Sequence, residues 1–233
     1  MEIKDKVFIV TGASGGIGFA LAKLLAKKGA KLVLAARSGD KIRQLAGGLP
    51  QALAVPTDMR KPEEIKNLIN KTLEKFGRVD VLVNDAGQGM YGPVETINIE
   101  QYQQIIELNV YGVLRAMQAV IPLMRKQGGG LILNVSSRVS KNYFPFLAAY
   151  SSTKYALNAV SLTARAELEK DRIVVCAFHP KMTATDFNVN AIGERPQWAA
   201  RPETPERPEV DTPEQVAEKI LGQIQSEEAE AGM

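Results

Sequence analysis

The sequence predicts an α/β fold with a single doubly wound parallel sheet and helices on both of its faces. Short apolar runs alternate along the chain with longer segments of helical periodicity. The short runs are continuously apolar, and such strands must be covered on both faces, which is typical of a parallel sheet with a helix after each strand. The expected strands lie within 7–11, 31–37, 52–58, 79–87, 131–137 and 172–180, the fourth ending in a glycine turn.

The helices are placed by their periodicity and by the residues at their ends. Pro62 suits the first turn of a helix, and Gly77 is a stop signal for the same helix. Thr212 and Pro213 form an equivalent start, with the threonine as N-cap. The expected helices cover 16–29, 41–49, 61–77, about 100–126, 150–170 and 212–225.

Length and composition exclude several classes of protein. The 233 residues fit one domain over 1–233, and 45% hydrophobic with 24% charged residues is ordinary for a globular chain. No apolar run approaches 18 residues, and the N-terminus has no signal-peptide layout, so neither a membrane partner nor export is expected. One cysteine (Cys176) and one histidine (His179) argue against disulfides and metal sites and agree with a cytoplasmic location. A net charge of +3 is too small to indicate nucleic-acid binding.

The composition changes after about residue 190. The segment 190–211 is expected to be either a substrate-side loop or a surface excursion without a role, since long irregular segments in compact domains are usually functional or disordered. The last residues, 226–233, are expected to form a short edge strand or a tail. Five of the twelve prolines lie after residue 190, at Pro196, Pro202, Pro205, Pro208 and Pro213.

A glycine-rich turn follows the first expected strand. In TGASGGIG the glycines at 12, 16 and 18 allow the backbone to turn sharply, so that N–H groups at the helix start can meet a pyrophosphate. A purely structural tight turn is the alternative interpretation. The same residues also match G-x-S-x-G, with Ser14, Asp80 and His179 in the order of a serine hydrolase triad. That second alternative is disfavoured, because the motif follows the first strand and no earlier strand supplies an oxyanion loop.

The end of the second strand indicates which dinucleotide would bind. An acidic residue there would bind the ribose hydroxyls of NAD, whereas this chain has Arg37 followed by Ser38. A guanidinium beside a hydroxyl suits a 2′-phosphate, so NADP(H) is expected in preference to NAD(H). Asp58, at the end of the third strand, is expected either to accept a bond from the adenine amino group or to cap the next helix.

A serine, a tyrosine and a lysine are spaced so that they can meet. Tyr150 and Lys154 lie four residues apart at a helix start, which puts both side chains on one face. A nearby ammonium favours the phenolate form of a tyrosine and brings it toward general acid–base use. Ser137 ends the fifth strand, where ligands of open α/β sheets bind.

Taken in order, these motifs resemble the short-chain dehydrogenase/reductase family over about 7–186. TGASGGIG fits the cofactor motif of that family, NVSS and YSSTK fit its catalytic motifs, and Asn109 in ELNVYG corresponds to its helix asparagine. Two segments depart from the family pattern. NDAG has Asp85 in place of the second asparagine of NNAG, and PKMTATD has Lys181 where glycine is usual. Both departures are expected to affect cofactor affinity.

The resemblance implies a Rossmann-like fold and a role for each catalytic residue. Tyr150 would protonate the substrate carbonyl as hydride arrives, Lys154 would lower the tyrosine pKa and hold the nicotinamide ribose, and Ser137 would orient the carbonyl. Asn109 would hold a water that relays protons, and Thr185 would bind the carboxamide. The full expected cofactor-binding set is Gly12, Ser14, Gly16, Ile17, Gly18, Arg37, Ser38, Asp58, Asn84, Ala86, Gly87, Tyr150, Lys154, Pro180, Thr183 and Thr185.

The expected activity is NADPH-dependent reduction of a hydrophobic ketone or aldehyde, reversible as alcohol oxidation. The apolar segment 141–149 before Tyr150 favours such a substrate, although core packing explains the same aromatic residues about as well. A sensor or scaffold that binds NADP(H) without turnover is the alternative from another class of function. The resemblance also implies a homodimer or homotetramer packed through the helices at 100–126 and 150–170.

Overall fold

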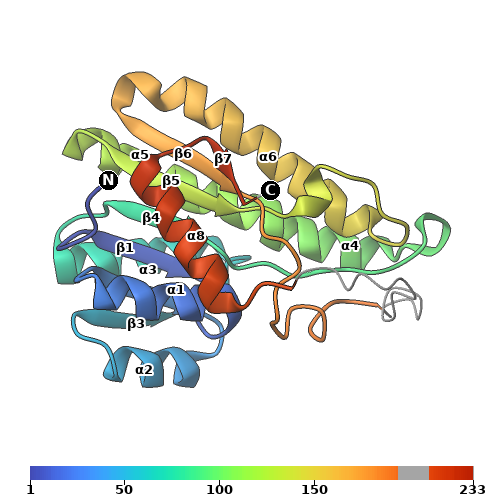
Figure 1. Ribbon diagram of the computed structural model, residues 1–233, viewed down its shortest axis with the longest axis horizontal. Helices are drawn as coiled ribbons and strands as arrows, with labels where there is room; N and C mark the ends of the chain where they lie inside the picture. The colour runs from blue at the N-terminus through green and yellow to red at the C-terminus, as the bar shows by residue number, and fades with distance from the viewer. Residues whose placement is uncertain (194–209, 233) are drawn as a thin grey trace.

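The computed structural model describes residues 1–193 and 210–232, and its centre is a seven-stranded parallel sheet (Figure 1). The strand order is β3-β2-β1-β4-β5-β6-β7. The chain therefore builds one half of the sheet outward from β1 and then returns to build the other half outward from β4. The strands are β1 Val7–Thr11, β2 Lys31–Ala36, β3 Ala52–Pro56, β4 Val81–Asn84, β5 Gly130–Val135, β6 Ile173–Phe178 and β7 Glu230–Ala231.

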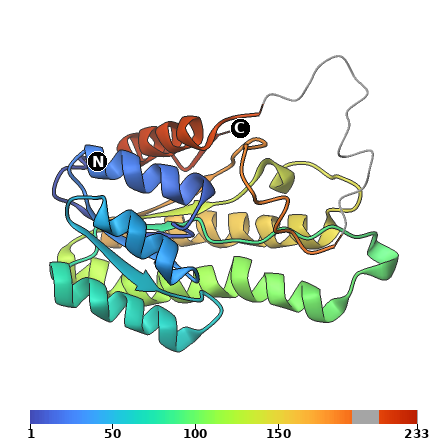
Figure 2. The ribbon, with the colours of Figure 1, turned by 90° about the horizontal axis from the view of Figure 1, so that it is seen from below.

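Helices cover both faces of the sheet, as the doubly wound prediction requires. Figure 2 shows α1, α2 and α8 in one layer and α3, α4, α5 and α6 in the other. The helices are α1 Gly16–Lys27, α2 Gly39–Gly47, α3 Pro62–Phe76, α4 Ile99–Ile106, α5 Val113–Gln127, α6 Ala148–Leu168 and α8 Pro213–Ser226, with 3-10 turns η1 Val94–Thr96, η3 Arg138–Ser140 and η4 Glu169–Asp171. None of the helices in the described ranges combines the length and apolar character that a membrane span needs. The predicted fold class is confirmed.

Two separate cores lie on the two faces of the sheet. Successive strand residues point to opposite faces, so Phe8 and Val10 pack with α1 and α8, whereas Ile9 packs with α3 and α5. Each of these side chains is fully buried, and burial of one such side chain stabilises the fold by roughly 1.5–3 kcal/mol. The continuously apolar strands are explained by this arrangement, since neither face of β1 contacts water.

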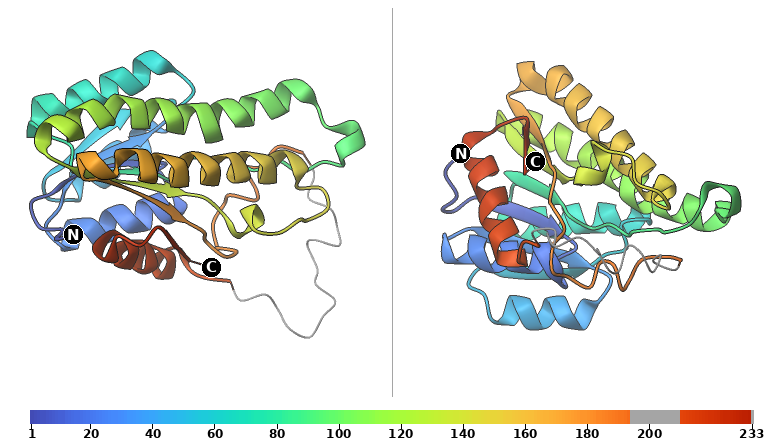
Figure 3. Two further views of the ribbon diagram at one scale, coloured as in Figure 1. Left: turned by 90° about the horizontal axis from the view of Figure 1, so that it is seen from above. Right: turned by 45° about the vertical axis from the view of Figure 1, so that its right-hand side comes forward.

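The long helix expected at 100–126 contains an irregular turn. The π-helical segment η2, Glu107–Gly112, separates α4 from α5, while Figure 3 shows the whole as one continuous rod. At Gly112 the backbone carbonyl of Met59 occupies the place that a Cβ would take. This close approach needs a glycine, and the widened turn directs Asn109 toward the carboxyl ends of the strands.

The C-terminal segment returns to the sheet. Thr212 caps α8 and forms a reciprocal capping box with Gln215. β7 then pairs in parallel with β6, with Glu230 opposite Ala177. Of the segment 190–211, residues 194–209 lie outside the described part of the chain. Residues 190–193 return to the loop after β4, because Ile192 forms a β-bridge with Met90.

Candidate active site

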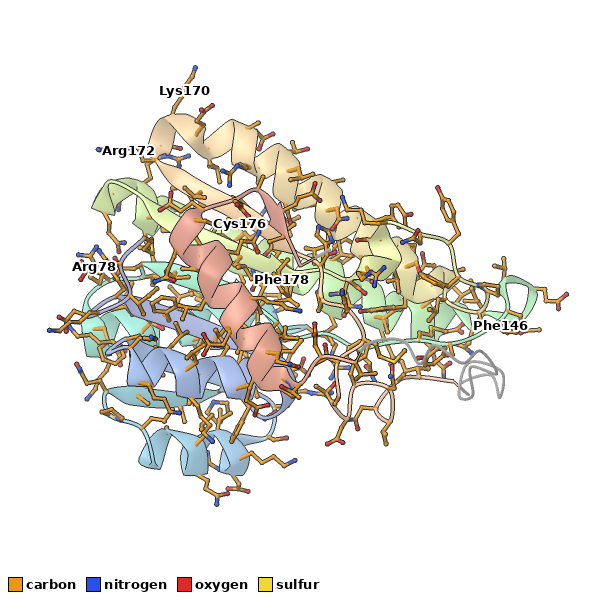
Figure 4. The ribbon with its side chains drawn as sticks, in the orientation of Figure 1. Arg78, Phe146, Lys170, Arg172, Cys176 and Phe178 are labelled. Atoms are coloured by element: carbon orange, nitrogen blue, oxygen red, sulfur yellow. The ribbon has the colours of Figure 1, made fainter. Side chains whose placement is uncertain are left out.

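The candidate site lies at the carboxyl ends of the central strands. Neighbouring β1 and β4 lead to connections that run in opposite directions, and open α/β sheets bind ligands at such a switch point. The motif residues after β1, β4, β5 and β6 all emerge at this edge. Figure 4 shows Phe146 at this end of the molecule, with Arg78, Lys170 and Arg172 at the opposite end.

Ser137, Tyr150 and Lys154 come together at this edge. Ser137 follows β5, and its side chain shares a hydrogen bond with that of Tyr150 in the first turn of α6. Lys154 lies one turn further along α6, with Nζ 5.9 Å from the centroid of the Tyr150 ring. The Lys154 ammonium also donates a hydrogen bond to the backbone oxygen of Val135 at 2.8 Å. The spacing in the sequence therefore corresponds to one compact cluster.

Burial shifts the pKa values of this pair in opposite directions. It raises the pKa of Tyr150, and the hydrogen bond with Ser137 only partly opposes the shift. It lowers the pKa of Lys154 to about 8. The sequence predicts that the Lys154 ammonium lowers the pKa of Tyr150; in this structure desolvation of the phenolate is the largest influence, and the pKa is raised overall.

Asn109 in the π turn is held by backbone and side-chain partners. Its Oδ1 accepts from the Gln88 nitrogen at 3.0 Å, and its Nδ2 donates to the Gln88 oxygen at 2.9 Å and to Thr153 Oγ1 at 3.1 Å. The side chain thus links the loop after β4 to α6. It also lies close to Lys154, since a Cβ at Gly87 would be 3.3 Å from Asn109 Oδ1 and 3.7 Å from Lys154 Nζ.

The glycine turn after β1 packs against the loop after β4. A Cβ at Gly12 would lie 2.9 Å from the Ala86 nitrogen, and Gly12 has a positive φ of 74°. Thr11 Oγ1 accepts hydrogen bonds from the Asp85 and Ala86 nitrogens, both at 3.1 Å. Glycine is therefore required at position 12 for space as well as for backbone conformation. Close by, Asn84 Nδ2 donates to Asn134 Oδ1 at 2.8 Å across the strands.

Asp85 places a carboxylate beside the start of α1. It accepts a hydrogen bond from the Gly18 N–H, and a Cβ at Gly18 would lie 2.8 Å from Asp85 Oδ2. Desolvation raises the pKa of Asp85 to about 7, and the positive charge of Lys154 opposes this shift. The family pattern has a neutral asparagine here, so this chain adds a titratable group at the N-terminus of α1.

A cluster of arginines surrounds the ends of β2 and β3. Asp58 binds Arg60 through both carboxylate oxygens, with the shortest contact 2.6 Å from Nη2, and this pairing lowers the pKa of Asp58. The charge of exposed Arg37 lowers it further. Arg43 turns back over the start of α2, where a Cβ at Gly39 would lie 2.9 Å from its Nη1. Asp58 does not cap α3, because the N-cap position is Lys61.

The segment after β6 covers the site from the other side. A Cβ at Gly16 would lie 3.2 Å from Thr185 Cγ2, so this segment meets the glycine turn. Further on, the Phe187 ring packs against the Tyr150 ring with centroids 5.5 Å apart. Tyr91 donates a hydrogen bond to Asn188 Oδ1 at 3.1 Å, which joins the segment to the loop after β4.

The remaining predicted cofactor residues lie at the same edge of the sheet. Ser38 is exposed at the start of α2, and its side chain makes no capping hydrogen bond there. The Pro180 oxygen accepts from the Arg138 nitrogen at 3.3 Å, and Thr183 Oγ1 donates to the Lys181 oxygen at 3.0 Å. Ser14, in the glycine turn, and Ile17, in the first turn of α1, are partly exposed. Lys181 itself lines a groove beside α8 together with Lys219.

The residues of the hydrolase alternative do not meet. Asp80 precedes β4 at the amino ends of the strands, opposite the candidate site. There it pairs with Arg78 and accepts a hydrogen bond from the Val7 nitrogen. His179 is buried after β6 and bonds to Glu230 and Ser140. A triad of Ser14, Asp80 and His179 is therefore not assembled. Within the described ranges, no group of three or more His, Cys, Asp or Glu side chains is placed to hold a metal ion.

The family follows from this fold, these motifs and a sequence match. Residues 6–195 match the sequence profile of the short chain dehydrogenase family. The chain belongs to the short chain dehydrogenase family. It is thus an oxidoreductase of this family, as its motifs predicted.

Relatives of known sequence and structure support the assignment. An uncharacterized oxidoreductase of Staphylococcus saprophyticus is 41% identical over 168 residues, covering 71% of this chain and 68% of the relative. The 3-ketoacyl-(acyl-carrier-protein) reductase of Brucella melitensis, solved with NADH, superposes with a TM-score of 0.87 at 30% identity, over 97% of this chain and 93% of that one. The alcohol dehydrogenase of the archaeon Thermococcus sibiricus, solved with 5-hydroxy-NADP, superposes with a TM-score of 0.82 at 31% identity, over 95% of this chain and 91% of that one.

Several residues of this short chain dehydrogenase site were not found from the sequence. Thr11 belongs to the glycine motif, but its role as acceptor for two backbone nitrogens depends on the neighbouring strand. Arg60 gave no signal beyond its position two residues after Asp58. Phe187 reaches Tyr150 from a segment 37 residues away in sequence, and only the closeness of an aromatic residue to the PKMTATD motif could have suggested it.

Proposed function

We propose that this short chain dehydrogenase reduces a hydrophobic ketone or aldehyde with NADPH, and oxidises the corresponding secondary or primary alcohol in the reverse direction. The observation that carries the proposal is the cluster of Ser137, Tyr150 and Lys154 at the carboxyl edge of the sheet. It provides a buried proton donor, a second hydroxyl and a cation within one small volume.

The residues present fit a dinucleotide. Gly12 and Gly18 let the turn pack closely against the loop after β4, and a Cβ at Gly15, just before α1, would meet only open space, where a pyrophosphate could approach the start of that helix. Arg37 and Ser38 would hold the adenosine side, and Thr185 the nicotinamide side. When bound, the nicotinamide would supply or accept the hydride.

Residues of the chain itself would donate the proton that the carbonyl oxygen needs. Because burial raises the pKa of Tyr150, its hydroxyl stays protonated at neutral pH and can donate to a carbonyl oxygen. Ser137 already shares a hydrogen bond with Tyr150, so both hydroxyls can reach the same oxygen. The Lys154 ammonium would stabilise the phenolate that forms, and Asn109 would hold the relay water beside Lys154.

The arginine cluster supports a preference for NADP(H). Arg37 in the loop after β2, Arg43 in α2 and Arg60 in the loop after β3 lie near the ends of β2 and β3. Their charge exceeds that of their partners Asp40 and Asp58, so the corner carries a net positive charge. A 2′-phosphate is the group that such a corner would bind. The related structures contain cofactors of both kinds, NADH in one and 5-hydroxy-NADP in the other.

Exposed aromatic side chains near Tyr150 support a hydrophobic substrate. Tyr143 is 90% exposed, and Phe144 and Phe146 are also exposed. All three belong to the segment that leads into α6, and Phe187 adds a ring beside Tyr150. Large apolar side chains gathered in this way are typical of a binding surface.

The test is the loss of turnover in Tyr150→Phe. Removal of the proton donor should reduce kcat on a carbonyl substrate by at least about 100-fold, since general acid catalysis contributes about 10²–10⁴-fold. Tyr155→Phe is the matched control, because Tyr155 lies on the same helix and stacks on exposed Tyr143. Retention of more than about a tenth of the activity in Tyr150→Phe would contradict the mechanism. NADPH binding without turnover of any carbonyl would support the alternative sensor or scaffold.

A further inference from the structure

His179 is a buried imidazole that the proposed reaction does not use. It follows β6 directly and is 0% exposed. Its Nε2 lies 2.9 Å from Glu230 Oε1, and its Nδ1 lies 3.3 Å from Ser140 Oγ and 3.4 Å from the Ser137 backbone oxygen. The ring therefore stands between the C-terminal strand and the turn that carries Ser137.

Glu230 determines which nitrogen of His179 carries the proton. Burial lowers the pKa of His179, so the ring is neutral at pH 7. The hydrogen bond from Lys141 Nζ, at 2.6 Å, holds the pKa of Glu230 below its usual value, so Glu230 is a carboxylate that can only accept. Nε2 of His179 must then donate to Glu230, and Nδ1 faces Ser140 as an acceptor.

Ser140 connects this pair to the backbone of Ser137. Its Oγ accepts from Asn158 Nδ2 at 2.8 Å, and its single proton can be donated either to the Ser137 oxygen at 2.5 Å or to His179 Nδ1 at 3.3 Å. Asn158 Oδ1 in turn accepts from Ser136 Oγ at 2.6 Å. Ser136 and Ser140, which precede and follow Ser137, thus both form hydrogen bonds with buried Asn158. A shift of Ser140 would therefore move the Ser137 carbonyl.

β7 is bound to the same place through its backbone. The His179 nitrogen donates to the Ala231 oxygen of β7 at 2.8 Å. One residue earlier in β6, the Phe178 oxygen accepts from the Ser136 nitrogen at 2.7 Å, which joins the end of β6 to the residue before Ser137. The two-residue strand therefore contributes one main-chain contact and one carboxylate to the support of this turn.

We propose that Glu230 and His179 are positioning residues, which act through Ser140 to hold Ser137 in the orientation that the substrate carbonyl requires. The inference rests on the proposed reduction in its kinetic consequence, whereas its structural consequence can be measured without turnover. Misplacement of a catalytic group by a fraction of an ångström to one ångström lowers the rate while substrate binding is retained.

The kinetic test compares Glu230→Ala with Glu230→Gln in the full chain. Alanine leaves His179 Nε2–H without its acceptor, whereas glutamine keeps an acceptor oxygen in place. We expect kcat to fall about tenfold in Glu230→Ala, with KM for the carbonyl and Kd for NADPH changed by less than about twofold. Glu230→Gln should restore most of kcat. Asp171→Ala is the matched control, since it breaks an ion pair with Arg125 at the amino ends of the strands, away from the candidate site.

A double-variant comparison tests the route through Ser140. Ser140→Ala should lower kcat to a similar extent, and the combination with Glu230→Ala should lower it little further, because both act through one contact chain. Additive losses, an unchanged kcat in Glu230→Ala, or equal losses in Glu230→Ala and Glu230→Gln would each overturn the proposal.

Amide hydrogen exchange tests the positioning role of Glu230 and His179 even if no carbonyl substrate of the enzyme is found. Amides in 137–141 should exchange faster in Glu230→Ala than in wild type, with Glu230→Gln and Asp171→Ala close to wild type. Unchanged exchange in this segment would overturn the positioning role even in an active enzyme. Absence of turnover in the wild type would contradict the proposed function, and the exchange result would still stand for or against this inference.

Discussion

Desolvation acts on three neighbouring side chains of the site and changes each in a different way. Burial disfavours the charged form of any group, so it keeps Tyr150 protonated, makes Lys154 easier to deprotonate and makes Asp85 easier to protonate. Two of these groups consequently titrate near neutral pH, at about 7 for Asp85 and about 8 for Lys154. The activity of this chain should therefore depend on pH within the physiological range.

The first prediction at this scale concerns Lys154. As the pH rises through about 8, Lys154 loses its proton and can no longer stabilise a phenolate at Tyr150. We expect kcat for carbonyl reduction to fall on the alkaline side of this pKa, which a profile of kcat from pH 6 to about 10 would measure. In Lys154→Arg, the residual activity should lack this decline, because arginine keeps its charge throughout. A flat wild-type profile would contradict the prediction.

The second prediction concerns Asp85. Its pKa is higher in the folded state than in the unfolded chain, so the stability it contributes is complete below about pH 4 and is lost as the pH rises to about 7. Asp85→Asn should therefore raise Tm more at pH 8 than at pH 5. It should also strengthen NADP binding at pH 8, because no carboxylate then competes with the pyrophosphate at the start of α1. Equal changes in Tm at both pH values would show that Asp85 is not titrating.

At the scale of elements, the π turn η2 combines a packing constraint with a functional one. Gly112 lets the backbone approach the Met59 carbonyl, and the same turn presents Asn109 to Gln88 and Thr153. A regular helix through 107–112 would rotate Asn109 away from these partners. Single-turn π segments are frequent at functional sites for this reason.

The prediction for this element is a contrast between two glycines. Gly112→Ala should destabilise the fold by about 1–3 kcal/mol, because the new methyl group has no room against Met59. Gly222→Ala is the control: it lies in α8 with nothing within 4 Å of a new Cβ, and it should stabilise the fold by up to about 1 kcal/mol. Urea denaturation of both variants measures the difference. A neutral Gly112→Ala would mean that η2 relaxes without strain.

At the scale of the whole molecule, the site belongs to no single element. It is assembled from β1–α1, the loop after β4, η2, the segment after β5, α6 and the segment after β6. A ligand that spans the edge of the sheet would therefore link both halves of the fold. The expected homodimer or homotetramer stays a prediction. Exposed Tyr111 in η2 and Leu162 on α6 lie on the helices expected to form its contacts, and light scattering would measure the mass.

Cofactor linkage gives the prediction at this scale. NADP at about 100 times its Kd should raise the free energy of unfolding by about 2.7 kcal/mol, and NAD at the same concentration should raise it less. Arg37→Asp should remove this difference, because the guanidinium at the end of β2 is replaced by a charge that repels the 2′-phosphate. Thermal unfolding with each nucleotide measures both effects. Preferential stabilisation of the wild type by NAD would overturn the cofactor assignment and leave the family membership intact.

The sequence by itself determined the fold class, the approximate positions of β1 to β6 and of the helices, and the family of this protein, because these depend on periodicity, end signals and motif spacing along the chain. It also predicted that Ser137, Tyr150 and Lys154 share one site, since the carboxyl ends of parallel strands meet at one edge. It did not predict the π turn η2. Only the tertiary structure decided which group is protonated and what surrounds it. Arg60 beside Asp58, Phe187 on Tyr150 and Glu230 on His179 are contacts whose partners are brought together by folding. Burial, and with it every pKa shift at the site, exists only once those partners exclude water.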